Sequence, residues 1–168
     1  MNMNKKVNML TLALSIALLP PLWAVLSPYI GITTGSVALI CAGVYVANGN
    51  KLADASKITI GFLCGDVWAI LALFIMETLP FSKNIVLFIT LFVLGGLAVI
   101  IGEIGHKFIY TPSWLCGWAI GLTIMGSMSF SKLHSLPLQI AISMIVGVFY
   151  VGVGVDLFQK ALIRIIKK

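Results

Sequence analysis

The chain is divided into apolar runs of about 20 residues, with connections only a few residues long between them. The hydrocarbon core of a bilayer is about 30 Å thick, and a helix needs about 20 apolar residues to cross it. Inside that core there is no water to form hydrogen bonds with the backbone. A spanning segment therefore folds as a helix, in which the N–H and C=O groups bond to one another. Apolar residues make up 60% of the 168 residues and charged residues only 10%, too few for the surface of a water-soluble domain. The sequence therefore predicts an all-α membrane protein.

Polar and proline-containing breaks between the runs predict six transmembrane helices in one domain that covers residues 1–168. The expected spans are residues 7–27, 30–48, 58–79, 84–102, 108–128 and 136–158. The first run also resembles a signal peptide, because Lys5 and Lys6 precede it. However, no clear cleavage site follows and Trp23 continues the run, so we interpret it as an uncleaved span that bends at Pro20–Pro21.

The basic residues gather on one side of this six-span arrangement. With the N-terminus inside, nine of the 11 basic residues face the cytoplasm, namely Lys5, Lys6, Lys51, Lys57, Lys107, Lys160, Arg164, Lys167 and Lys168. Lys83 and Lys132 face the other side. Cytoplasmic loops carry an excess of Lys and Arg, so we expect both termini in the cytoplasm. This distribution explains the net charge of +6 without a nucleic-acid partner.

A basic tail, residues 159–168, follows the last expected span. Asp156 and Lys160 are spaced i, i+4 and should pair on a helix. The other basic residues of the tail are expected to lie near anionic lipid headgroups. Either a simple anchor at the membrane surface or a specific lipid-binding site fits this pattern, and we favour the anchor.

Two short apolar segments, TTGSVALICAG and TPSWLCGWAIG, occupy matching places in the two halves of the chain. One alignment places Thr33 on Thr111, and a second, slightly different one places Gly65 on Gly147. Three spans in each half make the halves face opposite ways, which predicts a 3+3 inverted repeat. The two repeats are expected at about residues 7–80 and 84–158. In such repeats, short helices at matching places indicate the substrate site.

We expect each short helix to begin at a threonine that caps it, with Pro112 in the first turn of the second helix. The start of a helix has unsatisfied N–H donors and a partial positive charge. Two such starts aimed at the middle of the membrane would repel cations and offer donors to a carbonyl or an anion. The candidate pathway residues on these segments are Thr33, Thr34, Thr111, Ser113, Trp114 and Trp118. The alternative is that both helices are simply short and closely packed through glycines.

Asp66 is the one carboxylate well inside an expected span. An ionisable residue in the membrane is costly to keep, which makes it a functional candidate together with its neighbour Trp68. Asp66 could bind a proton or accept hydrogen bonds from a substrate amide. It could also be structural, accepting from a tryptophan N–H or from the opposing half. Its counterpart in the second repeat is Val148, so the carboxylate does not belong to the symmetric part of the repeat.

The sequence contains no recognisable catalytic or metal-binding set. The three cysteines lie inside apolar runs without the spacing of metal ligands. Glu103 and His106 have the Glu-x-x-His spacing of di-iron sites, but the other ligands that such a site requires are missing, so we interpret them as a solvated turn. We therefore expect neither an enzyme nor a bound metal or cofactor.

Four segments, GSVALICAGVYVANGN, GFLCGDVWAI, TPSWLCGWAIGLTIMG and LPLQIAISMIVGVFY, resemble the domain of unknown function 1097 family of small bacterial inner-membrane proteins. The resemblance covers nearly the whole chain. It implies a multi-pass protein of the bacterial inner membrane and brings no substrate with it. More loosely, the short helix in each half is similar in pattern to urea-transporter repeats, although Thr33-Thr34 and Thr111-Pro112 replace their Asn-Pro pair.

The function that the sequence favours is a channel or facilitator for a small neutral or weakly anionic solute, such as an amide like urea, a small acid, an alcohol or a gas. One alternative is a proton-coupled carrier that uses Asp66. Another is a membrane scaffold or assembly protein that transports nothing. The expected partners are the lipid bilayer and a small solute, and glycine pairs spaced four apart also favour a homo-oligomer.

Overall fold

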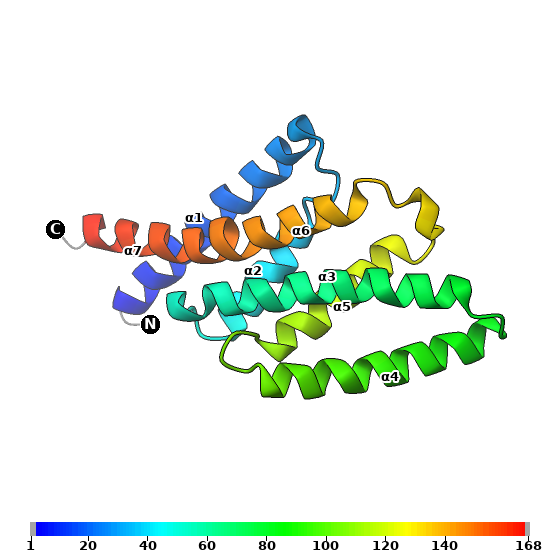
Figure 1. Cartoon of the computed structure of the whole chain (residues 1–168). Coiled ribbons are helices and arrows are strands. Elements are labelled where there is room, and N and C mark those ends of the chain that lie inside the picture. Colours follow the sequence, from blue (N-terminus) through cyan, green and yellow to red (C-terminus); the bar gives the residue numbers. More distant parts are fainter. Residues whose placement is uncertain (1–2, 167–168) are drawn as a thin grey trace.

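The computed structural model describes residues 3–166, and these form helices joined by short turns, with no strand among them (Figure 1). The α-helices are α1 (Met3–Leu26), α2 (Val37–Ala47), α3 (Ala55–Thr78), α4 (Lys83–Ile104), α5 (Thr111–Met125), α6 (Leu136–Val146) and α7 (Gly154–Ile166). A π-helical segment, η4 (Gly147–Val153), joins α6 to α7 and makes them one long helix. The all-α prediction is confirmed.

Within the described residues, four helical stretches are long and apolar enough to cross a membrane: Lys5–Ile30, Leu52–Thr78, Lys83–Ile104 and Leu136–Ile166. The other two expected spans are shorter than the prediction. The helix α2 has 11 residues and α5 has 15, so they rise about 16 Å and 22 Å, against about 30 Å for the hydrocarbon core. The protein is thus a helical membrane protein with four candidate spans and two short helices.

The prediction for the second span is wrong at its beginning, because residues 30–36 are not part of the helix α2. Gly31 has a left-handed backbone with a φ of 78°, which ends the 3₁₀ turn Ser27–Ile30 that follows α1. Non-glycine residues adopt this conformation only at a cost, so the glycine marks a change of chain direction. The apolar side chains around it made the segment look helical by composition alone. By contrast, α1 continues through Pro20 and Pro21 to Leu26.

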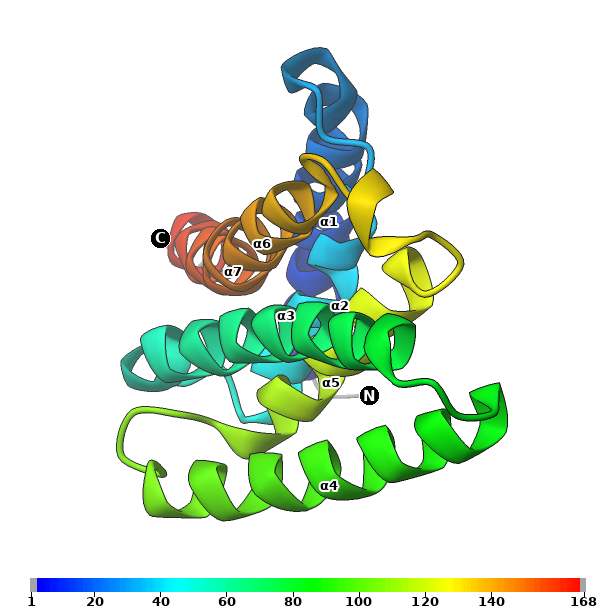
Figure 2. The same ribbon diagram turned by 45° about the vertical axis from the view of Figure 1, so that its right-hand side comes forward.

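Each short helix packs on a long helix from the other half of the chain. The helix α5 lies along α3, while α2 lies along η4 and α6; α1 and α4 lie at opposite edges of the bundle (Figures 1 and 2). Both contacts depend on a glycine. A Cβ on Gly147 would lie 2.6 Å from the carbonyl oxygen of Ala38 in α2, and a Cβ on Gly65 would overlap the α5 backbone at Trp114. The two glycines that align in sequence therefore have the same packing role.

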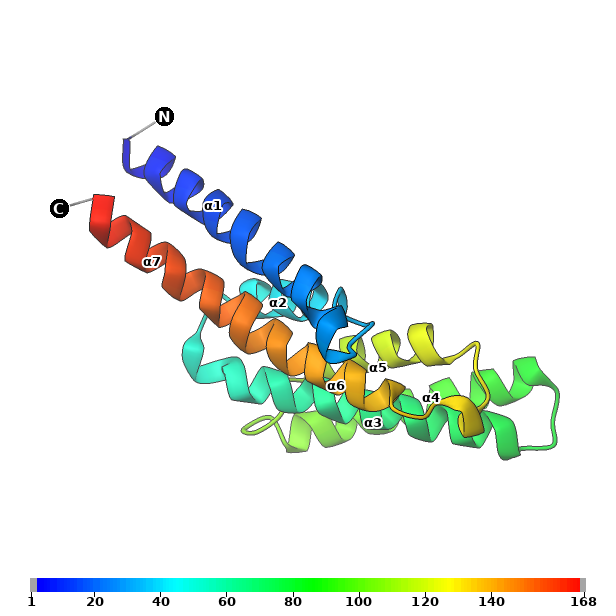
Figure 3. The same ribbon diagram turned by 90° about the horizontal axis from the view of Figure 1, so that it is seen from above.

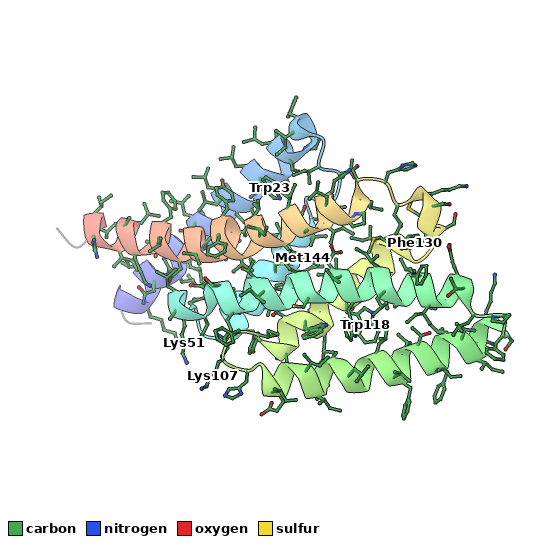
Figure 4. The ribbon with its side chains drawn as sticks, viewed as in Figure 1. Trp23, Lys51, Lys107, Trp118, Phe130 and Met144 are labelled. Atoms are coloured by element: carbon green, nitrogen blue, oxygen red, sulfur yellow. The ribbon has the colours of Figure 1, made fainter. Side chains whose placement is uncertain are left out.

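Apolar side chains fill the middle of the bundle, where the two halves meet. The large fully buried side chains there come from α2, α3, α6 and η4: Tyr45, Ile58, Phe62, Ile140, Met144 and Val148. Figure 4 shows Met144 between the last long helix and α3. This packed layer joins the two halves of the chain.

Both termini lie at the same end of the bundle, where α1 and α7 run side by side (Figure 3). Lys51 and Lys107 lie at this end as well (Figure 4). The predicted pair on α7 is confirmed, because Lys160 Nζ lies 2.6 Å from an Asp156 carboxylate oxygen. Lys167 and Lys168 lie outside the described residues, and the other basic residues that the sequence placed on one side share this end of the fold.

Candidate functional site

Asp66 lies on the face of α3 that packs against α5, and only 4% of its surface is exposed. Its Oδ1 atom is buried and has no hydrogen-bond partner among the described residues. Gly121 of α5 lies beside it, since a Cβ on this glycine would lie 3.6 Å from Oδ1, and its missing side chain lets α5 pack closely against Ala69 of α3. The sequence correctly singled out a carboxylate inside the protein, but the predicted structural partner for Oδ1 is not there.

Two tryptophans of α5, Trp114 and Trp118, are also buried, and neither indole N–H has a partner in the described chain. The Trp118 ring reaches α4, where it lies 3.8 Å from the position of a Cβ on Gly95 (Figure 4). Trp114 packs edge-on against Trp68 of α3, with ring centroids 5.2 Å apart. Trp68 differs from both, because its Nε1 donates to the Leu94 carbonyl oxygen at 2.9 Å. Trp68 therefore fastens α3 to α4.

Thr90 completes this group from α4. Its side chain is 2% exposed, and its Oγ1 has no partner among the described residues. It lies one turn from Leu94 on the buried face of α4, the face that Trp68 contacts. Sequence reasoning missed Thr90, because one hydroxyl in an apolar run barely changes its hydropathy. The available signal was its position near the middle of the span, where a polar residue is expensive.

Asp66, Thr90, Trp114 and Trp118 are called the polar set below. They lie on α3, α4 and α5, three helices that pack together. An unpaired polar group in an apolar interior costs several kcal/mol by analogy with small-molecule transfer. The set combines two N–H donors, a hydroxyl that can donate or accept, and a carboxyl oxygen. Such a combination can bind a small molecule that has both a carbonyl and an N–H or O–H group.

A cavity of about 410 Å³ opens beyond the polar set, at the end of the bundle opposite the termini. Leu73 and Val86 form part of its lining; they lie about two turns beyond Asp66 on α3 and one turn beyond Thr90 on α4. Glu77 lines it too and accepts a hydrogen bond from the Phe130 N–H at 2.7 Å. This wide, partly polar cavity is called the vestibule, and the polar set lies deeper in the bundle, next to its inner end.

The predicted start of the first short helix lies elsewhere, against α6. Thr34 Oγ1 is 3.0 Å from Ser143 Oγ, and the N–H and hydroxyl of Thr33 both donate to Gln139 Oε1 at 3.0 Å. The helix α2 begins only at Val37 and has no side-chain cap. The capping prediction is wrong here, because these hydroxyls bond across to another helix instead of back along their own.

The second helix start is also uncapped by its threonine. Thr111 is the first residue of α5, its side chain packs against Gly102 of α4, and Tyr110 occupies the capping position. Ser113 Oγ donates to the Tyr110 carbonyl oxygen at 2.8 Å, and the Tyr110 N–H donates to the backbone carbonyl oxygen of Lys57, near the beginning of α3, at 3.2 Å. The helix α5 thus begins near one end of the bundle, and the two starts do not converge on one point.

The model of a family described as "Protein of unknown function (DUF1097)" matches residues 13–160. The chain belongs to this family. No curated protein and no solved structure gives a significant match.

The DUF1097 match runs from α1 into α7 and includes all of the polar set and the residues of the vestibule. It confirms the resemblance seen in the sequence, whereas the likeness to urea-transporter repeats remains a pattern without support from these comparisons. The family description assigns no activity, so the chemistry of the site is the guide to function.

Proposed function

We propose that the protein is a passive facilitator for a small, neutral or weakly anionic solute in the bacterial inner membrane. The observation that carries the proposal is the polar set: four buried polar side chains on three packed helices, each with a polar atom that has no partner within residues 3–166. Hydrocarbon surroundings make such groups costly, which favours a role in binding a polar guest. The vestibule beyond them supports access from the side opposite the termini.

The chemistry of the set favours an amide or a small carboxylic acid over an ion. The N–H groups of Trp114 and Trp118 can donate to a carbonyl oxygen, and Asp66 can accept from an amide or acid proton. Thr90 can do either. A bare cation would find one carboxyl group but also two donors that repel it. A passive route also agrees with the scarcity of charged residues inside the spans.

The proposal includes a 3+3 inverted repeat, which the packing supports. Gly65 and Gly147 align in sequence, and each receives the short helix of the other half. The long helices α3 and α6–α7 would then be the equivalent third spans of the two repeats. The polar set lies on one side of the packed middle of the bundle, and residues of both repeats contribute to it: Asp66 from the first, and Thr90, Trp114 and Trp118 from the second.

Orientation follows from the basic residues at the end that holds the termini. Reporter fusions at Lys51, Lys107 and the C-terminus are expected to read cytoplasmic, because the side rich in Lys and Arg stays inside. Fusions at Lys83 and Lys132 are expected to read periplasmic. Paired phosphatase and fluorescent-protein reporters measure this directly. A periplasmic C-terminus would contradict both the orientation and the inverted repeat.

Transport itself can be tested in proteoliposomes with stopped-flow light scattering and a panel of amides, weak acids and alcohols. The Thr90→Val variant keeps the shape of the side chain and removes only the hydroxyl. We expect the flux of the preferred solute to fall about fivefold, the equivalent of one hydrogen bond of about 1 kcal/mol. Folding should be unaffected, since Thr90 Oγ1 has no partner in the described protein.

Thr123→Val is the matched control for this experiment. Thr123 lies on the exposed side of α5, and its hydroxyl donates to its own helix at Ala119, 2.7 Å away. We expect wild-type flux from this variant. Equal flux in both valine variants would remove Thr90 from the site, and no flux above empty liposomes for any solute would favour the scaffold alternative.

A further inference from the structure

A long apolar slot lies on the other side of the bundle, between α1, α2 and the last long helix. It consists of two adjoining cavities of about 310 and 280 Å³ that share Pro20, Leu39 and Val151 in their walls. The slot is open along its side, since Leu39 of α2 is 55% exposed and Leu12 of α1 is 40% exposed. In a membrane protein this opening faces the acyl chains of the bilayer.

The slot ends in polar residues where the termini lie. Asn50, Asp156 and Gln159 line this end. Gln159 Nε2 donates to the Asn8 carbonyl oxygen at 3.1 Å, which ties α7 to α1 beside the mouth of the slot. The tie brings the charged ends of two helices together, although they lie at opposite ends of the sequence (Figure 3).

Exposed cations surround this mouth. Lys5 and Lys6 lie on α1 within one turn of Asn8, while Lys160 and Arg164 lie on α7 next to Gln159 and one turn beyond it. Asp156 is the one acid lining the mouth, and it is already paired with Lys160. The mouth therefore carries an excess of positive charge directly above an apolar slot.

We propose that this slot binds an anionic phospholipid, with one acyl chain lying between α1 and α2 and the phosphate group held by the cations at the mouth. Basic pockets between transmembrane helices on the cytoplasmic side bind anionic headgroups in this way. Charge complementarity selects the headgroup, and the apolar, laterally open wall suits an acyl chain. The site is separate from the polar set, so it does not rest on the transport proposal.

Gly43 offers a way to fill the slot without disturbing the fold. It lies in the wall of the slot, and a Cβ there would meet nothing within 4 Å. The side chain in a Gly43→Phe variant can therefore occupy the space of the acyl chain. Gly96→Phe is the matched control, because a Cβ on Gly96 would also meet nothing within 4 Å and the residue belongs to α4, the helix at the far edge of the bundle.

The test reconstitutes the protein with equal amounts of phosphatidylglycerol and phosphatidylcholine, extracts it in mild detergent, and counts retained lipids by native mass spectrometry. We expect wild type and Gly96→Phe to retain one phosphatidylglycerol per chain, and Gly43→Phe to lose it. The double variant Lys160→Gln, Arg164→Gln should lower the preference for the anionic lipid about 30-fold, since each basic residue near the surface contributes about fivefold. Lys57→Gln with Lys107→Gln, at the same end but outside the slot, should leave the preference unchanged.

Three results would overturn the proposal. They are no retained phosphatidylglycerol in the wild type, equal retention by Gly43→Phe, and equal retention of both lipids by the wild type. A dimer mass in the wild type that becomes a monomer mass in Gly43→Phe would instead assign the slot to a second copy of the chain.

Discussion

Replacing Asp66 with leucine is expected to leave the protein folded while reducing solute flux at least tenfold. The variant keeps the branching of the side chain and removes a buried oxygen that has no partner in the described part of the chain. An unpaired buried polar group costs about 1–3 kcal/mol, so the variant should be as stable as wild type or more stable. Thermal unfolding in detergent and stopped-flow flux in proteoliposomes measure the two effects on the same preparation.

The Asp66→Asn variant separates a facilitator from a proton-coupled carrier. Asparagine keeps the size and an accepting oxygen but cannot ionise. A passive facilitator should then keep its flux within about twofold, the range expected for a loss well below one hydrogen bond. A carrier that needs proton binding at this position should lose transport. If Asp66→Leu fails to fold, the carboxylate is structural and the polar set is not a binding site.

The second large effect is expected at the two packing glycines. A Cβ at Gly65 or Gly147 meets the backbone of a facing helix, which cannot move aside as the end of a side chain can. Each alanine variant should lose about 1–3 kcal/mol of stability, the usual range for an overpacked core. Valine at either position should prevent assembly of the bundle. Thermal unfolding and size-exclusion profiles in detergent report both outcomes.

Gly43→Ala and Gly96→Ala are the controls for the packing glycines, since the space around both is open. We expect unchanged or slightly higher stability, because alanine favours a helix more than glycine does. Similar losses at Gly65 and Gly147 would support the inverted repeat, in which the two contacts are equivalent. A harmless Gly147→Ala beside a damaging Gly65→Ala would argue against that equivalence.

The sequence predicted the long helices well, because hydropathy alone governs whether a run can cross a membrane. The third and fourth spans were expected at residues 58–79 and 84–102, and the helices occupy Ala55–Thr78 and Lys83–Ile104. Composition predicted the wrong helix boundary where a turn occurs inside an apolar run, as at Gly31. Backbone direction there depends on one glycine, which a count of apolar residues does not register.

The candidate site was predicted only in part, because the local sequence does not indicate which residues on different helices will contact one another. Asp66, Trp114 and Trp118 were expected to matter and do lie on packed neighbours with Thr90, which was missed. The threonines at the helix starts were expected to cap, yet Thr34 bonds to Ser143, more than one hundred residues away. Hydroxyls in hydrocarbon take whichever acceptor the fold brings near, and the fold has to be known first.

The π-helical segment Gly147–Val153 has a consequence for the phase of the last helix. One extra residue within a helical turn rotates everything beyond it by about 100° relative to an uninterrupted α-helix. The segment lies just where α2 docks, so α6 keeps the alignment that Gly147 needs while α7 is turned to another side. That turn aims Asp156 and Gln159 at α1 and α2. The two long helices on which the short helices pack therefore present equivalent faces up to the docking glycine and different faces beyond it. Within the described residues, the mouth of the slot thus has no symmetry-related counterpart in the other half of the chain.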